Sequence, residues 1–230
     1  SVYSLIKGRL ERLSDAARRI LEAAVAAGRE FEFEIVARAA ALSETAASEA
    51  LAELSEAGLI VPLEGLRFRF DHNLTMEVAY REMGDPRHRV LHRRTAEAME
   101  AIYSPRRLEY QSGVVASHFV EGHAFERAAP YALQAGHRAF RLAAWSEAIA
   151  FYEQALEGAE GRDRYTIRMA LGEVRVRSGP VYLAADAFRE ALRLAEAMQD
   201  APAIDAARLA LARADVLLAR FDETIELARR

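Results

Sequence analysis

Residues 67–80, RFRFDHNLTMEVAY, change their hydrophobic pattern half-way along. The first four residues alternate basic and aromatic side chains, which is typical of a strand with one buried face. After Asn73 the apolar side chains follow helical spacing instead. One histidine, His72, lies where the pattern changes. This stretch therefore predicts a strand that leads directly into a helix, and it divides the chain into two parts.

The residues before this stretch predict three helices. Ser14 and Ser43 each precede an apolar-periodic segment, and serine is a preferred N-cap residue. Between these two helices, the apolar residues at 31, 33, 35 and 36 predict a short helix that ends near residue 41. A further helical segment, residues 2–12, comes before Ser14.

A hairpin is predicted after the three helices. Residues 59–63 and 66–70 are apolar or alternating, and Glu64–Gly65 between them has the composition of a tight turn. In the second strand Leu66, Phe68 and Phe70 are expected to face inward. Three helices followed by a two-stranded β-hairpin is the plan of a winged-helix domain, which we expect over residues 1–83.

The last helix before the hairpin argues against direct DNA reading. In DNA-binding winged helices this helix enters the major groove and needs positive charge. Residues 43–57 contain no lysine or arginine, and they contain four glutamates: Glu44, Glu49, Glu53 and Glu56. The remaining interpretations are a module that docks within the protein, or simply a solvated acidic helix.

A basic helix is predicted beyond the junction. Residues 73–83 form a first helix, and the sequence Gly-Asp-Pro at 84–86 ends it and starts a second, which runs to about residue 102. Arg87, Arg89 and Arg93 are weak candidates for contacts with phosphate or a partner, because basic runs on helices are usually only solvated.

The histidines of this region are weak candidates for a metal site. His88 and His92 are four residues apart and share a helix face, but no metalloprotease-like carboxylate lies between them. A solvated or packing role is the stronger interpretation for this pair, and also for His118 and His123. No metal site is predicted. Residues 103–109 are read as a linker and 110–121 as a helix, so that 84–123 connect two domains.

Residues 124–230 predict paired helices. The segment 145–156, WSEAIAFYEQAL, recurs 36 residues later as VYLAADAFREAL at 181–192, with a fainter echo from Phe221. This pattern resembles tetratricopeptide repeats, whose period is about 34 residues and whose alanines allow helices to cross closely. The alternative is an ordinary helical bundle. The overall fold class is therefore mostly α, a winged-helix domain followed by an α-helical tetratricopeptide-like repeat array.

Composition narrows the class of protein. The chain has 230 residues, 52 % of them apolar and 29 % charged, a net charge of −4 and no cysteine. No apolar run is long enough to span a bilayer and no signal peptide opens the chain, so we expect a cytoplasmic protein without membrane association. Because the chain starts with Ser1 and ends in a helical pattern, we expect a longer protein and further repeats.

Several short runs, in order, resemble one bacterial family. They are RRIL at 18–21, AAGREF at 26–31, GLI at 58–60, FRFDHNL at 68–74, EVAY at 77–80 and RVLH at 89–92. Over residues 9–156 the chain resembles the segment that follows the ATPase core of STAND-type signalling ATPases. These include activators related to the maltose-regulon activator, antibiotic-cluster regulators and ATPase-linked nucleotide cyclases.

The resemblance implies a nucleotide switch. In related ATPases a winged-helix histidine reaches the phosphates of bound ADP and holds the resting state, and inducer binding with ATP exchange opens the molecule for oligomerisation. His72 would carry that role here, and a protonated imidazole is a charge-assisted donor to phosphate. Asp71 departs from the pattern, since a carboxylate repels phosphate. Strand alternation predicts that the two side chains diverge. A purely structural role for His72, as a helix cap or a partner of a buried carbonyl, is the alternative.

The sequence thus predicts a regulatory and sensor role without catalysis. No Gly-x-x-x-x-Gly-Lys-[Ser/Thr] phosphate loop occurs in these residues, and no catalytic constellation stands out. ATP or ADP is implied only for the longer protein. Its expected partners are an upstream ATPase core, an inducer or protein on the repeats, and DNA only through another domain, as in transcription regulation. The alternatives are a DNA-binding winged-helix regulator and a repeat scaffold for protein–protein interaction.

Overall fold

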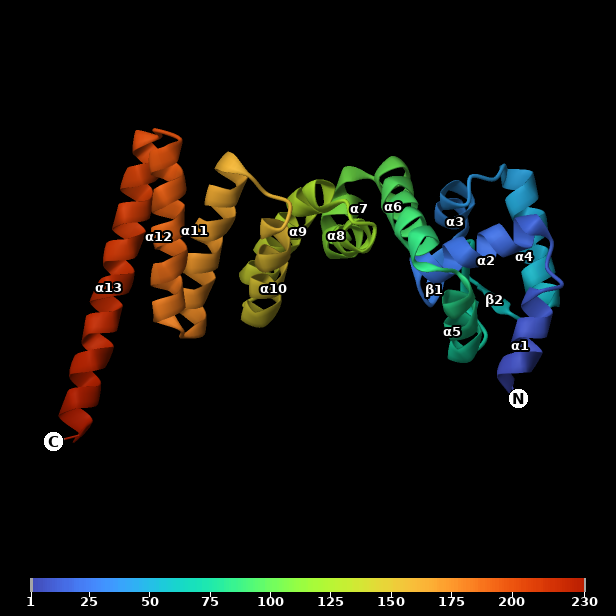
Figure 1. The fold of residues 1–230 in the computed structure, drawn as a ribbon, viewed down its shortest axis with the longest axis horizontal. Coiled ribbons are helices and arrows are strands. Elements are labelled where there is room, and N and C mark those ends of the chain that lie inside the picture. The colour runs from blue at the N-terminus through green and yellow to red at the C-terminus, as the bar shows by residue number, and fades with distance from the viewer. Residues whose placement is uncertain (1, 230) are drawn as a thin grey trace. The chain divides into compact units, whose positions relative to one another are not determined.

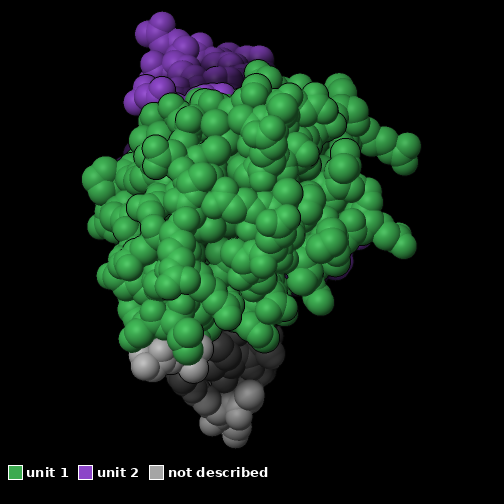
Figure 2. All heavy atoms as spheres, turned by 90° about the vertical axis from the view of Figure 1, so that its right-hand side faces the viewer, with its two compact units in different colours: residues 1–108, 117–124 green, residues 109–116, 125–230 purple. Residues whose placement is uncertain are grey.

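The computed structural model describes residues 2–229, and the side-chain surroundings of residues 3–219. Within these residues the chain forms 13 helices and three strands, so the protein is mostly α-helical (Figure 1). It divides into two compact units, coloured in Figure 2: residues 1–108 with 117–124, and residues 109–116 with 125–230.

The first unit contains most of the predicted helices. Ser14 caps the second helix, its Oγ accepting from the Ala17 N–H at 3.1 Å, and Ser43 caps the fourth, its Oγ accepting from the Ala46 N–H at 3.3 Å. Both predicted caps are confirmed. The helices are α1 (Val2–Leu10), α2 (Asp15–Ala27), α3 (Phe33–Ala39), α4 (Glu44–Glu56), α5 (Asn73–Glu82) and α6 (Asp85–Ile102).

The sheet of this unit has three strands, so the predicted two-stranded hairpin was incomplete. Strand β1 (Glu30–Glu32) pairs with β3 (Arg67–Phe70), which also pairs with β2 (Ile60–Leu63), in the order β1-β3-β2 with both pairings antiparallel. Phe31 was assigned to a helix because of its spacing from the apolar residues that follow. It is buried, and its ring packs on the rings of Phe68 and Phe70 with centroids 6.0 and 5.7 Å away. This pairing with a distant strand overrides the local helical pattern.

Leu66 was also wrongly predicted to face inward. The hairpin turn takes three residues, 64–66, and the strand begins only at Arg67. Leu66 adopts a left-handed backbone, with φ of 56°, and remains 64 % exposed. Its carbonyl accepts the Phe33 N–H at 3.0 Å, which joins the turn to the start of α3.

The predicted linker at 103–109 is mostly helical. Helix α7 (Pro105–Tyr110) begins at a proline, which suits the first turn of a helix. Arg107 forms an ion pair with Glu32 at the end of β1, and its guanidinium lies 3.9 Å from the ring centroid of Tyr103. The Tyr103 hydroxyl donates to the same carboxylate at 2.8 Å. These contacts with a distant strand order a segment whose composition resembles a loop. Helix α8 (Ser112–Glu121) follows after a break at Gln111.

The second unit consists of helices that pack against their neighbours in the chain. They are α9 (Phe125–Arg141), α10 (Trp145–Leu156), α11 (Gly161–Ser178), α12 (Val181–Ala197) and α13 (Ala201–Arg229). Helices α11, α12 and α13 lie side by side in Figure 1. The two segments that were predicted to be equivalent, from Trp145 and from Val181, begin α10 and α12. The side chains of the fainter echo from Phe221 lie outside the described residues.

Small residues make the helix crossings in this unit. Ala148 and Ala155 on α10 are fully buried, as are their counterparts Ala184 and Ala191 on α12. Their burial agrees with the expected use of alanine between packed helices. A cluster of mostly small and aromatic residues is the resulting core, with Tyr152 among its largest buried side chains.

Candidate functional site

His72 occupies the junction between the sheet and α5. Strand β3 ends with the buried ring of Phe70, and the Asp71 N–H then donates to the Leu59 carbonyl at 3.1 Å. His72 follows in an extended conformation as the N-cap residue of α5, and its carbonyl accepts from the Thr75 N–H at 3.1 Å. The backbone is therefore held on both sides of the histidine. Its side chain makes no capping hydrogen bond and is 78 % exposed.

Asp71 and His72 do not diverge as strand alternation predicted. The Nε2 atom of His72 lies 3.2 Å from the Oδ2 atom of Asp71. The prediction failed because β3 ends at Phe70, so the two residues are no longer part of a pleated strand. The carboxylate occupies the nitrogen that would donate to a phosphate.

The three candidate arginines have different surroundings. Arg87 forms an ion pair with Glu22 of α2, which ties the first turn of α6 to that helix. Arg89 and Arg93 are exposed. The backbone of Arg93 lies close to Gly122, so close that a Cβ at Gly122 would come within 2.9 Å of the Arg93 N. Arg93 thus marks a packing contact of α6 with the end of α8.

Of the four histidines considered for a metal site, His92 and His118 form a pair in which His118 is buried and His92 is partly buried. The Nδ1 atoms of His92 on α6 and His118 on α8 lie 3.0 Å apart. One Nδ1 must donate and the other accept, so the accepting ring is neutral and carries its proton on Nε2. Burial lowers the pKa of His118 to about 4, and burial also lowers that of His92. Proximity in the fold pairs His92 with His118 rather than with His88.

His88 is instead held within the first unit by Tyr80. Its Nε2 lies 2.9 Å from the Tyr80 carbonyl oxygen, and the two rings stack with centroids 3.8 Å apart. His123 lies in the turn that follows α8, in a left-handed conformation with φ of 54°. Among the described residues, no three His, Asp or Glu side chains are grouped so as to hold a metal ion.

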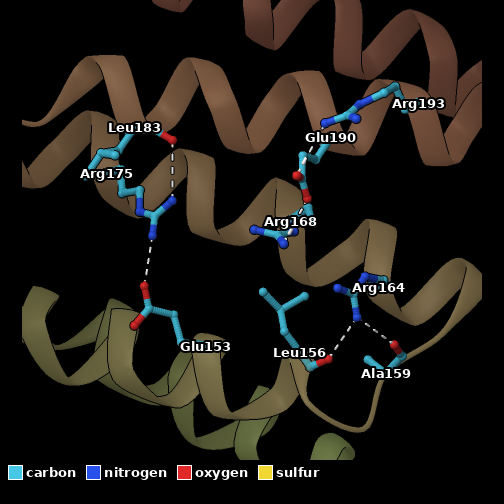
Figure 3. A network of polar contacts seen from close by, with 9 residues as sticks. All are labelled: Glu153, Leu156, Ala159, Arg164, Arg168, Arg175, Leu183, Glu190 and Arg193. Carbon is cyan, nitrogen blue, oxygen red and sulfur yellow. Dashed lines mark hydrogen bonds and ion pairs between the residues drawn. The ribbon is translucent and has the colours of Figure 1, made fainter.

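A network of arginines on α11 was not predicted from the sequence. Figure 3 shows Arg164, Arg168 and Arg175 extending from this helix toward α10 and α12. Arg175 donates to Glu153 of α10 at 2.8 Å and to the Leu183 carbonyl of α12 at 3.4 Å. The guanidinium therefore bridges two neighbouring helices. The signal that could have revealed it is the spacing of 4 and 7 residues, which puts the three arginines on one helix face.

The other two arginines complete this network. Arg164 donates to the carbonyls of Leu156 and Ala159, at 2.9 and 3.3 Å, where α10 ends. Arg168 pairs with Glu190 at 2.8 Å, and its buried Nε has no acceptor among the described residues. Burial lowers the pKa of Arg168. Each arginine of this row thus has an internal acceptor, which indicates a structural role.

A cavity of about 490 Å³ lies among α11, α12 and α13. Its walls are mostly apolar, and they include the ring of Phe188 and the side chains of Val176 and Val216. Glu173 of α11 and Arg213 of α13 also line it. Binding sites for small molecules typically have this size and this mixture of apolar walls with a few polar groups. Sequence reasoning missed the cavity because its three walls come from three helices.

Two further findings bear on the class of protein. In the part of the chain that the structure describes, no helix is both long and apolar enough to cross a lipid bilayer. Comparison of the chain with family models, with curated proteins and with solved structures finds no match.

Proposed function

We propose that this chain is the regulatory and sensor part of a STAND-type signalling ATPase, in which the first unit is a winged-helix domain and the second a tetratricopeptide-like array. The helical pairs would bind an inducer or protein partner. The winged-helix unit would transmit this binding to a nucleotide held by an ATPase core elsewhere in the longer protein. The chain itself would carry no catalysis.

The order of elements in the first unit supports the winged-helix interpretation. Helix α2 is followed by β1, then by the helix pair α3 and α4, and then by the hairpin β2–β3. The first strand closes the sheet next to β3 rather than next to β2. A helix-turn-helix pair followed by such a hairpin is the arrangement of a winged helix.

A repeated contact in the second unit supports the tetratricopeptide-like interpretation. Gly136 of α9 lies against the ring of Tyr152 on α10, and Gly172 of α11 lies against the ring of Phe188 on α12. Both members of the second contact come 36 residues after those of the first. A glycine in the first helix and an aromatic residue in the second, four residues after an alanine, belong to the tetratricopeptide pattern.

The exposed position of His72 is the observation that carries the nucleotide-switch proposal. Its backbone is fixed by the hairpin and by α5, whereas its imidazole projects from the surface. A protonated imidazole in such a place can donate to a phosphate presented by another domain. Asp71, 3.2 Å away, would compete for the same nitrogen, so that contact with phosphate requires the ring to turn away from the carboxylate.

The experiment measures ADP retention by the longer ATPase that contains this chain. His72→Ala should lose bound ADP faster, whereas Asp71→Asn should retain it longer, because the competing carboxylate is removed. Glu64→Ala, in the exposed turn of the same hairpin, is the control and should leave retention unchanged. Equal retention in all four proteins would reject the role of His72. The absence of a phosphate-binding loop from the longer protein would reject the ATPase assignment altogether.

Helix α4 supports an internal role for the winged helix rather than DNA reading. Glu44, Glu49 and Glu56 are exposed on this helix. Glu53 accepts from both the backbone N–H and the hydroxyl of Ser14, at 2.8 and 2.6 Å, so it is engaged within the unit. Exposed carboxylates repel the phosphates of DNA. Titration of this chain with duplex DNA at low salt should therefore show no binding.

A further inference from the structure

The cavity among α11, α12 and α13 has an apolar floor that is part of the core. Phe188 is almost fully buried, and the partly buried Val176 and Leu217 pack against the same cluster. Val216 on α13 stays 54 % exposed. The cavity of about 490 Å³ thus offers apolar surface to a ligand of modest size without unfolding of the helices.

The cavity has one charge of each sign on its walls. Glu173 lies on α11 and Arg213 on α13, and both are exposed. Within residues 3–219 neither side chain forms an ion pair or a hydrogen bond. They therefore do not neutralise each other across the cavity, and each keeps its hydrogen-bonding capacity for a ligand.

Other charged side chains on α11 and α13 do form ion pairs. Arg168 and Arg175 of α11 are paired with Glu190 and Glu153. On α13, Arg208 lies 3.6 Å from Glu196. These three arginines are thus paired within the protein, whereas Glu173 and Arg213 on the cavity walls are not. Charge complementarity then selects a ligand with a cationic and an anionic end.

We infer that this cavity binds a small zwitterion with an apolar body, namely a short apolar peptide of about two or three residues with free ends. Its ammonium group would bind Glu173, its carboxylate would bind Arg213, and its side chains would contact Phe188 and Val216. This inference rests on the proposed function only in treating the bound peptide as the inducer. All residues of the site belong to this chain.

A crossed set of ligands and variants tests the inference by isothermal titration calorimetry with the 230-residue chain. The probes are leucyl-leucine, its N-acetyl form, which lacks the ammonium group, and its C-terminal amide, which lacks the carboxylate. The unmodified protein should bind leucyl-leucine about fivefold to tenfold more tightly than either blocked form, because each blocked form loses a charged hydrogen bond.

The variants should lose these preferences selectively. Glu173→Gln should no longer distinguish leucyl-leucine from its N-acetyl form, but should still disfavour the amide. Arg213→Gln should show the opposite pattern. Glu147→Gln on α10 and Arg208→Gln on α13 change exposed charges that do not line the cavity, so they should bind like the unmodified protein. Circular dichroism of each variant checks that its helices are intact.

Three results would overturn the inference. They are no saturable binding up to about 10 mM peptide, equal binding of all three ligands, and losses that do not follow the crossed pattern. These results leave the nucleotide switch untouched, because ADP retention by the His72 and Asp71 variants measures it separately. Conversely, crossed peptide binding would stand even if His72 had no influence on ADP.

Discussion

Gly172 of α11 lies against the aromatic ring of Phe188 on α12, so closely that a Cβ there would come within 2.2 Å of a ring carbon. The equivalent Cβ at Gly136 would come within 2.5 Å of the ring of Tyr152. Both rings are almost fully buried, so neither can move aside cheaply. The glycines thus allow a large side chain of the second helix to fill the space beside the first.

Gly172→Ala should therefore destabilise the second unit by about 1–3 kcal/mol through overpacking, despite the higher helix propensity of alanine. Urea unfolding followed by the fluorescence of Trp145, which lies in this unit, measures the change. Gly8→Ala on α1 is the control, because nothing lies within 4 Å of a Cβ there. That variant changes only the first unit, so it should leave the unfolding transition seen by Trp145 unchanged. A stable Gly172→Ala protein would show that the ring of Phe188 is free to shift.

The His92–His118 pair should make the first unit sensitive to acid. Burial holds the pKa of His118 at about 4, below its ordinary value of 6.5. Above pH 6.5 this histidine is neutral in both states. As pH falls below 6.5, the unfolded chain takes up a proton that the folded protein does not, so stability is lost down to about pH 4. The shift corresponds to about 3 kcal/mol at most.

His118→Asn should reduce this acid sensitivity, because the amide can still bond to His92 but does not titrate. Urea unfolding of both proteins between pH 7 and pH 4, followed by circular dichroism, gives the difference in slope. An NMR titration of the His118 ring provides the direct check. A ring that titrates close to 6.5 would contradict the burial of the pair.

Leu66→Asn should stabilise the first unit by about 1 kcal/mol, because asparagine tolerates the left-handed backbone that leucine adopts here at a cost. The side chain is largely exposed, so little packing is lost. Leu142→Asn is the matched control: Leu142 is 73 % exposed and does not have a positive φ. Thermal unfolding should show a gain for the first variant alone. Equal effects would mean that exposure of leucine, and not backbone strain, is responsible.

Arg175→Met should destabilise the second unit by about 1–2 kcal/mol, since it removes donors to Glu153 and to the Leu183 carbonyl from a largely buried position. Methionine keeps the apolar stem of the side chain in place. Arg189→Met breaks only exposed contacts, with Asp186 and Asp215, and should cost less than about 0.5 kcal/mol. The fluorescence of Trp145 during urea unfolding compares the two. Similar costs would show that the bridge from α11 to α10 and α12 adds nothing.

Local chemistry made several elements of this protein predictable. Ser14 and Ser43 are helix caps because a hydroxyl next to an apolar-periodic segment satisfies the first free N–H groups. The start of α10 at Trp145 and of α12 at Val181 followed from a repeat written in the chain. The position of His72 between strand and helix followed from a change of hydrophobic period. The cap and junction signals lie within a few residues of the features that they predict.

Other features depend on segments that are distant in the chain. Phe31 belongs to a strand because Phe68 and Phe70 lie beside it, and residues 105–110 form a helix with Arg107 bound to Glu32. The Asp71 carboxylate contacts His72 because β3 ends at Phe70, so strand alternation no longer separates the two side chains. These outcomes were predicted wrongly because the local preference for helix, strand or loop is weak. The long-range contacts contribute more free energy than this preference and therefore override it.

The sequence by itself determined the helical periods, the caps, the repeat of 36 residues and the candidate histidine. Only the tertiary structure decided which side chains share a site. It paired His92 with His118 and brought Glu173 and Arg213 to one cavity. The physical reason is that the hydrophobic period of a segment indicates only which face of that helix or strand is buried. A site is formed by the faces of several elements. Packing sets how those elements are placed against one another.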